Sequence, residues 1–152
     1  MAISSFSILK QIGSIKIDEG NEIRFSVDAY KQSRYLSVRK YLKSETYSGP
    51  TKAGITLTSE VVIKIAKALA TLPEDINSIK DGELGKYARR QGLAIVLRVS
   101  SFNTNKGIDI RQWQEDETYT GWTKKGIRLP LEKLAEIKEL FRLSAEYFEG
   151  NK

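Results

Sequence analysis

The side chains that could do chemistry in this chain are mainly cations and aromatic rings. The 152 residues contain no His and no Cys, which excludes Ser-His and Cys-His catalysis, zinc fingers and disulfide frameworks. Glu45, Glu117 and Asp109 could be imagined as the acid and base of a hydrolase, but nothing in their spacing singles them out, and we interpret them as solvated hairpin charges. We therefore expect a non-catalytic protein that uses no cofactor and no metal.

The cations and rings alternate with aliphatic residues in several short stretches, as they do when a β-strand has one face in the core. With the aliphatic residues inward, the outward face of the first half collects Arg24, Tyr30, Tyr35, Arg39, Tyr41 and Lys52, and that of the second half collects Arg98, Phe102, Arg111, Trp113, Lys124 and Arg128. Single-stranded nucleic acid suits such a surface, because cations follow phosphates and rings stack on unpaired bases. Each residue taken alone is also ordinary for a solvent-facing strand. The recurrence of the set favours the binding interpretation, although common ancestry of the halves would also preserve it.

An internal repeat organises the chain. The stretch SETYSGPTKAGITL (residues 44–57) returns as DETYTGWTKKGIRL (residues 116–129), and residues 23–72 align with residues 95–144 at an offset of 72 without a gap. Fourteen of the 50 aligned pairs are identical. Two copies are too few for a solenoid and suggest a fused dimer with internal pseudo-twofold symmetry.

Each copy predicts three antiparallel strands followed by one helix. In the first copy the strands are EIRFSVDAY, SRYLSVRKY and TKAGITL, and a helix capped by Thr58 runs through SEVVIKIAKALATL to Pro73. In the second copy they are LAIVLRVSSF, GIDIRQW and TKKGIRL, with a helix that begins near Pro130. Residues 73–92 form the expected linker, part of which we expect to form an extra strand. Turn geometry and close backbone approach account for the paired glycines Gly49/Gly121 and Gly54/Gly126.

The fold class predicted from these elements is α+β: two tandem units of curved antiparallel sheet, each followed by one helix, that form an intrachain pseudo-dimer. The first unit covers residues 1–80 with its core at 23–72. The second covers residues 81–152 with its core at 95–144. We expect the two units to pack as one compact body.

Two stretches resemble the C-terminal domain of positive cofactor four, a single-strand-binding transcriptional coactivator. They are YLSVRKYLKSETYSGPTKAGITLTSEVVIKIAKAL and GIDIRQWQEDETYTGWTKKGIRLPLEKLAEIKEL. The second stretch carries the family pattern closely, with IDIR at residues 108–111 and KGIRL at residues 125–129. The first is looser, with LSVR at residues 36–39 and Ala53 in place of the family's lysine. The tandem arrangement is also similar to the Whirly and Pur-alpha groups.

The resemblance implies a curved sheet with one helix per unit and two units joined through helices and sheet edges. It also implies roles for individual residues. The strand-end arginine falls on Arg39 and Arg111 and its aromatic neighbour on Tyr41 and Trp113. The basic residue before the glycine falls on Lys125, with Lys52 and Lys124 one step earlier, and the aromatic near the end of the first strand falls on Tyr30 and Phe102. The acidic run at residues 115–117 and Ala53 suggest that the two copies contribute unequally.

The leading functional hypothesis is largely sequence-independent binding of single-stranded DNA in transcription, replication or repair. RNA binding on the same surface and a protein-interaction scaffold are the alternatives. We expect DNA-associated localisation in a nucleoid or nucleus, with organelle import left open, and partners among transcription or replication proteins or further copies of the chain. The net charge of +6 favours polyanionic partners. No apolar run is long enough for a membrane span, and residues 3–9 lack the marks of a secretory signal.

Overall fold

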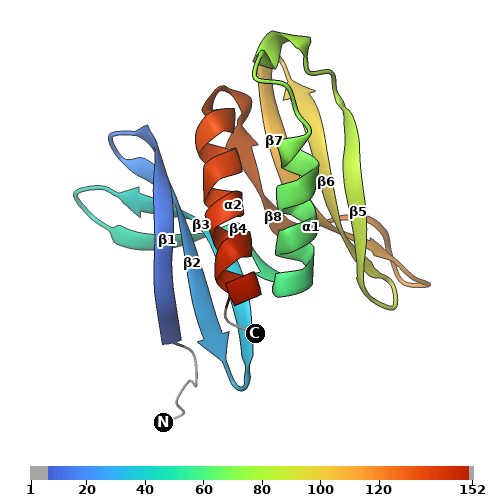
Figure 1. The fold of residues 1–152 in the computed structure, drawn as a ribbon, viewed down its shortest axis with the longest axis horizontal. Coiled ribbons are helices and arrows are strands. Elements are labelled where there is room, and N and C mark those ends of the chain that lie inside the picture. The colour runs from blue at the N-terminus through green and yellow to red at the C-terminus, as the bar shows by residue number, and fades with distance from the viewer. Residues whose placement is uncertain (1–6, 151–152) are drawn as a thin grey trace.

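A computed structural model of the chain describes residues 7–150. It contains eight strands and two α-helices (Figure 1). The strands are β1 (Ser7–Asp18), β2 (Asn21–Tyr30), β3 (Ser33–Lys43), β4 (Ser48–Thr58), β5 (Gly82–Arg90), β6 (Leu93–Phe102), β7 (Asn105–Glu115) and β8 (Thr120–Pro130). The helices are α1 (Ser59–Ala70) and α2 (Leu134–Gly150), with short 3-10 turns at Ile76–Ser78 and Leu131–Lys133. Most of the apolar stretch at residues 3–9 lies outside the described residues. Neither described helix is long and apolar enough to cross a membrane.

The eight strands form one antiparallel sheet in the order β1-β2-β3-β4-β8-β7-β6-β5. The second four strands therefore repeat the order of the first four from the opposite edge. The halves meet between β4 and β8, where the described pairing is the single register position Gly54 with Gly126. These two glycines occupy the same position in the two copies of the repeat.

All six strands predicted within the repeat are present, and each copy has a fourth strand, of which only β1 was not expected. β5 confirms that part of the linker is a strand. β1 escaped prediction because its register with β2 shifts three times, between Ile8 and Lys10, between Gln11 and Gly13, and between Lys16 and Asp18. Each shift breaks the period-2 alternation by which a strand is recognised from its sequence.

The helices begin where capping chemistry places them. Thr58 caps α1 by accepting a hydrogen bond from the backbone N–H of Val61 at 3.5 Å. This helix ends at Ala70, slightly before Pro73, and the Thr71 hydroxyl donates to the carbonyl of Ala68 at 2.7 Å. The second helix starts with one 3-10 turn after Pro130 and becomes α-helical at Leu134.

The two helices pack together on one face of the sheet, and each completes the core of the other half (Figure 1). α2 lies over the first four strands, where the rings of Phe25 and Phe141 meet edge-to-face with centroids 5.2 Å apart. Leu140 lies over Gly13 of β1, where a Cβ would come within 2.6 Å of its Cδ2. In return, α1 contacts β5 of the second half. The aliphatic face of each half-sheet therefore depends on a helix from the other half of the chain.

Replacing Phe141 by Ala should destabilise the whole molecule by about 3–5 kcal/mol, because both Phe25 and Phe141 are fully buried and the cavity would lie between the halves. Urea unfolding followed by circular dichroism measures the loss. Lys67→Ala, on an exposed position of α1, is the control and should change the free energy of unfolding little. Equal stabilities of the two variants would contradict this account of the core.

Candidate nucleic-acid interface

The face of the sheet opposite the helices carries most of the residues predicted to bind. On β2, β3, β6 and β7 the aliphatic residues under the helices are buried, while the alternate positions point away. Ten of the thirteen predicted residues lie on this helix-free face: Arg24, Tyr30, Tyr35, Arg39, Tyr41, Arg98, Phe102, Arg111, Trp113 and Arg128. The other three, Lys52, Lys124 and Lys125, lie where β4 and β8 bulge.

In the first half, cations and rings are already in contact. The guanidinium of Arg24 lies 4.1 Å from the centroid of the Tyr41 ring, and its Nε pairs with Glu22 at 2.6 Å. Arg39 donates from Nη1 to the carbonyl of Thr51 at 2.9 Å. Its side chain lies over Gly54, where a Cβ would stand 2.8 Å from the Arg39 Cζ. Because Gly54 has no side chain, the side chain of Arg39 can lie against the sheet.

The second half has a larger cluster that includes a residue not predicted from the sequence, Trp122. Its ring meets Trp113 edge-to-face at 4.8 Å, and the Arg98 guanidinium lies 4.4 Å from its centroid. Trp122 pairs directly with Trp113 in register. The signal was hidden because Trp122 has Pro50 as its counterpart in the first copy, so the repeat comparison gave it no aromatic equivalent.

Asp109 was interpreted as a solvated hairpin charge, and that interpretation is wrong. Its side chain is only 4% exposed and forms ion pairs with Arg98 at 3.3 Å and with Arg111 at 3.2 Å. A buried carboxylate needs such partners, since it gives up its hydration. Asp109 therefore holds two of the predicted binding arginines in place and offsets part of their charge.

The Thr-Lys-x-Gly motif forms a β-bulge in both copies. Between Arg111 and Trp113 the β7 strand has one residue, whereas β8 has three between Gly126 and Trp122. The Thr123 hydroxyl accepts the N–H of Lys125 at 3.2 Å, and in the first copy Thr51 accepts the N–H of Ala53 at 3.1 Å. The bulge ends the strict alternation of faces. The three lysines at these bulges, Lys52, Lys124 and Lys125, are exposed.

The tyrosine of the Glu-Thr-Tyr-x-Gly part of the motif closes the hairpin that precedes each bulge with a hydrogen bond. The Tyr47 hydroxyl donates to the carbonyl of Pro50 at 2.5 Å, and Tyr119 donates to that of Trp122 at 2.7 Å. Gly49 and Gly121 lie beneath these hydroxyls with φ of 155° and 152°. A Cβ there would clash with the tyrosine, so the expected close approach at these two glycines is confirmed.

Two exposed rings end the face at its two far corners. Phe102 and Tyr30 are 70% and 46% exposed and stand at the ends of β6 and β2. The hairpins next to them turn through Asn103 and Lys31, which have φ of 58° and 57°. Single exposed rings are common on protein surfaces, so this exposure shows only that the two rings are accessible to a ligand.

Arg128 has an internal structural task. Its guanidinium donates to the Ser100 hydroxyl at 2.5 Å and to the carbonyls of Ser100 at 2.8 Å and Asn105 at 3.0 Å. It therefore fastens the β6–β7 hairpin to β8. Of the predicted cations, the lysines on the bulges are the more accessible to a ligand.

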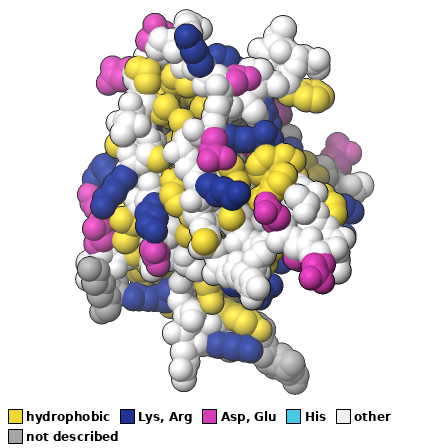
Figure 2. Space-filling view, turned by 90° about the vertical axis from the view of Figure 1, so that its right-hand side faces the viewer, with side chains coloured by type: hydrophobic (Ala, Val, Ile, Leu, Met, Phe, Trp, Pro, Cys, Tyr) yellow, Lys and Arg dark blue, Asp and Glu magenta, His cyan; other side chains and the backbone are white. Residues whose placement is uncertain are grey.

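Charge on the molecule is mixed rather than uniformly basic. Seen from the β5 side, Lys and Arg side chains lie among hydrophobic ones with Asp and Glu between them (Figure 2). Within residues 7–150 there is no group of three or more Asp and Glu side chains arranged to hold a metal ion. Asp28 lies on the helix-free face of β2, and its burial raises the pKa of its carboxyl, against opposing effects of a hydrogen bond from Ser26 and the charge of Arg39.

Comparison with known proteins identifies both copies of the repeat. The family described as Transcriptional Coactivator p15 (PC4) matches residues 17–68 and 91–140, together about two thirds of the chain. A comparison with curated protein sequences gives no match.

Two plant proteins of known structure match this chain at very low identity. WHY3 from Arabidopsis thaliana is 7% identical over 99% of this chain and 94% of its own, with a TM-score of 0.43. The plant transcriptional regulator PBF-2 is 6% identical over 97% of this chain and 82% of its own, also with a TM-score of 0.43. Similarity this low says nothing about what this chain binds.

Asp28→Asn should stabilise the fold more at pH 7 than at pH 3. Because the folded-state pKa of Asp28 is raised above its ordinary value of 3.8, its contribution to stability is full below that pH. The contribution is lost as pH rises through the folded-state pKa, and Asn does not undergo this loss. Urea unfolding at the two pH values measures the difference. Glu45→Gln, which removes an exposed hairpin charge, is the control; a pH-independent effect of Asp28→Asn would contradict the assignment.

Proposed function

The chain belongs to the transcriptional coactivator p15 (PC4) family, and from this premise we propose that it binds single-stranded DNA without catalysis and largely without regard to base sequence. The helix-free face of the sheet is the proposed binding surface. The proposed role is in transcription, replication or repair, and the proposed localisation of the protein is on the DNA of a nucleoid or nucleus. Proteins of those processes are the proposed partners.

One observation carries the proposal: in both halves an arginine lies against an aromatic ring on the helix-free face. Arg24 stacks on Tyr41 and Arg98 on Trp122. At these distances the ring attracts the cation, which favours a guanidinium position over the ring. Rings and guanidinium groups on one face offer stacking surfaces to the bases and positive charge to the phosphates of an unpaired strand.

The proposed roles follow accessibility. Lys52, Lys124 and Lys125 contact phosphates, because they are exposed and project from the bulges. Arg39 and Arg111 lie over Gly54 and Gly126 and contact phosphates at the junction of the two halves. The exposed rings of Tyr30 and Phe102 stack on bases at the outer ends of the face.

We also propose that residues 1–80 and 81–152 form an intrachain pseudo-dimer that acts as one binding body. The pairing of Gly54 with its repeat equivalent Gly126 supports a pseudo-twofold axis at that point. The exchange of helices between halves supports joint rather than separate folding.

The binding proposal is tested with a fluorescent oligo(dT) titrated across a range of salt. Lys124→Ala/Lys125→Ala should reduce the slope of log affinity against log salt by about 1.4, since each neutralised phosphate contributes about 0.7 for single strands. Phe102→Ala should leave the slope unchanged and weaken binding by about 1–3 kcal/mol, the usual loss of one stacked base. Lys10→Ala/Lys67→Ala, with the same change in charge, is the control.

The same titration distinguishes the other hypotheses. Equal affinity for duplex and oligo(dT) would overturn the preference for single strands. A matched RNA oligomer that binds more tightly than DNA would replace DNA by RNA as the ligand, since only RNA offers a 2′-hydroxyl. Absence of binding to all three would favour a protein-interaction scaffold.

Separately produced halves should be unfolded alone and should fold when mixed. Residues 1–80 lack the helix that covers their sheet, and residues 81–152 lack the helix that contacts β5. Circular dichroism and size-exclusion chromatography of each half and of the mixture measure this. A cooperative thermal transition in either isolated half would contradict the proposed interdependence.

A further inference from the structure

The sheet has a notch at each end of the junction between its halves. β4 and β8 pair at Gly54 and Gly126 and then diverge, so a hollow lined by residues from both halves opens on either side. The two hollows have volumes of about 510 Å³ and 500 Å³. We call them the first notch, beside the start of α2, and the second notch, beside the start of α1. They are related by the repeat: Thr58, Glu60 and Gln112 of the second correspond to Pro130, Glu132 and Lys40 of the first.

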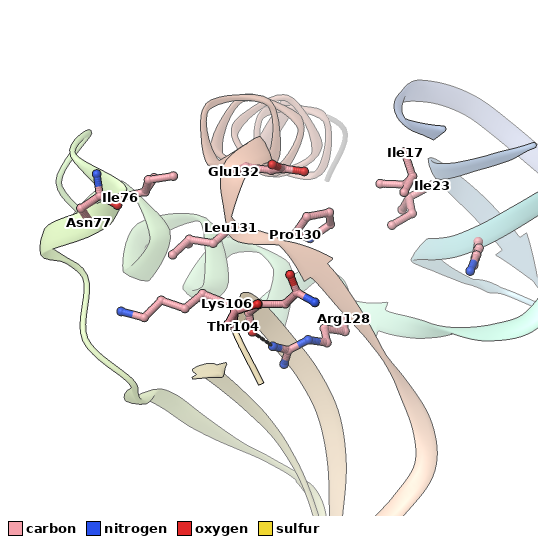
Figure 3. A pocket seen from close by; sticks show the side chains of 12 residues that line it. Ile17, Ile23, Ile76, Asn77, Thr104, Lys106, Arg128, Pro130, Leu131 and Glu132 are labelled. Atoms are coloured by element: carbon pink, nitrogen blue, oxygen red, sulfur yellow. Dashed lines mark hydrogen bonds between the residues drawn. The ribbon is translucent and has the colours of Figure 1, made fainter. Parts of the chain in front are cut away.

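The first notch has a lining of mixed polarity, and two of its three cations, Lys106 and Arg128, already bond protein groups (Figure 3). Ile76 of the linker, Leu131 and Pro130 form its wall on the side of the second half. Lys106 donates to the carbonyl of Ile79, and Arg128 to the carbonyls of Ser100 and Asn105. Protein groups already use these charges.

The second notch is more polar and more basic. Four cations line it, Lys64, Arg89, Arg90 and Lys125, against the single carboxylate of Glu60. Lys64 is paired with Glu60 at 3.0 Å, and Arg89 donates weakly to Gln112 at 3.4 Å. Among residues 7–150, the side chains of Arg90 and Lys125 have no hydrogen-bond or ion-pair partner. The notch therefore presents uncompensated positive charge in a concave site.

Two rings complete the second notch. Tyr35 of β3 and Tyr87 of β5 both line it and are half-buried. A base can stack on such a ring, and the volume is within the range of small-ligand sites. Gln112 is 6% exposed and reaches the same wall, so the polar lining does not consist of surface cations alone.

We propose that the second notch binds the phosphomonoester of a nucleotide, with a base placed against Tyr35 or Tyr87. A phosphomonoester carries close to two charges at neutral pH and three acceptor oxygens, and it therefore suits a site lined by two arginines better than a singly charged diester does. The group belongs either to the phosphorylated end of a DNA strand or to a free mononucleotide. The strand-end form rests on the proposed function, because the notch then holds the end of a strand that is bound on the helix-free face. The mononucleotide form does not depend on the proposed function.

The first experiment titrates the ¹⁵N-labelled full chain with thymidine 5′-monophosphate and, separately, with thymidine. We expect saturable shifts at Arg89, Arg90 and Gln112 with the nucleotide and none with the nucleoside. Arg89→Ala/Arg90→Ala should weaken binding by about tenfold or more, as loss of charge-assisted hydrogen bonds requires. The matched control Lys10→Ala/Lys67→Ala should bind as the wild type does.

The second experiment compares oligo(dT) of one length with a 5′-phosphate, a 3′-phosphate or no terminal phosphate. Tighter binding of one phosphorylated form, lost in Arg89→Ala/Arg90→Ala while the unphosphorylated oligomer binds as before, assigns the notch to a strand end. Equal binding of all three oligomers with nucleotide shifts present assigns it to a free nucleotide. Equal binding with no nucleotide shifts overturns the proposal. If no oligomer binds but the nucleotide does, the proposed function fails and the notch site stands.

Discussion

The contact between β4 and β8 constrains the rest of the molecule. Two four-stranded halves of the sheet join through one register position, at which neither strand has a side chain. The space above each glycine is filled from its own half, by Arg39 over Gly54 and by Arg111 over Gly126. A Cβ at either position would push a guanidinium off the sheet, so the residue that permits the junction also sets the position of the central cations.

So narrow a junction cannot hold two sheets together through backbone hydrogen bonds alone. The helices supply the missing association by crossing to the opposite half, where Phe141 packs on Phe25 and Leu140 on β1. This arrangement places most of the apolar burial on one side of the sheet. The other side is then free of the demands of the core and carries rings, arginines and two buried carboxylates, Asp28 and Asp109.

The repeat and the alternation of faces were readable from the sequence, and they located six strands, both helices and the outward set of cations and rings. Pattern reasoning failed where the backbone departs from regular pairing. The three register shifts in β1 concealed a whole strand, and the bulge in β8 concealed the pairing of Trp122 with Trp113. Asp109 was misread for a different reason: it pairs with Arg98 of the neighbouring strand β6 as well as with Arg111 of its own strand, and the pattern of one strand does not reveal the partner from the next.

The stacked arginines of the two halves do not occupy equivalent positions. Arg24 corresponds to Val96 in the repeat, and Arg98 corresponds to Ser26. The two halves therefore place an arginine against an aromatic ring from different strand positions. A dimer of identical chains must present the same groups on both sides of its axis and reads the same from either end. Polynucleotides have a direction, and a surface of strict twofold symmetry has no means to distinguish 5′-to-3′ from its reverse. Because the two halves of this chain differ, the two ends of its sheet are not equivalent.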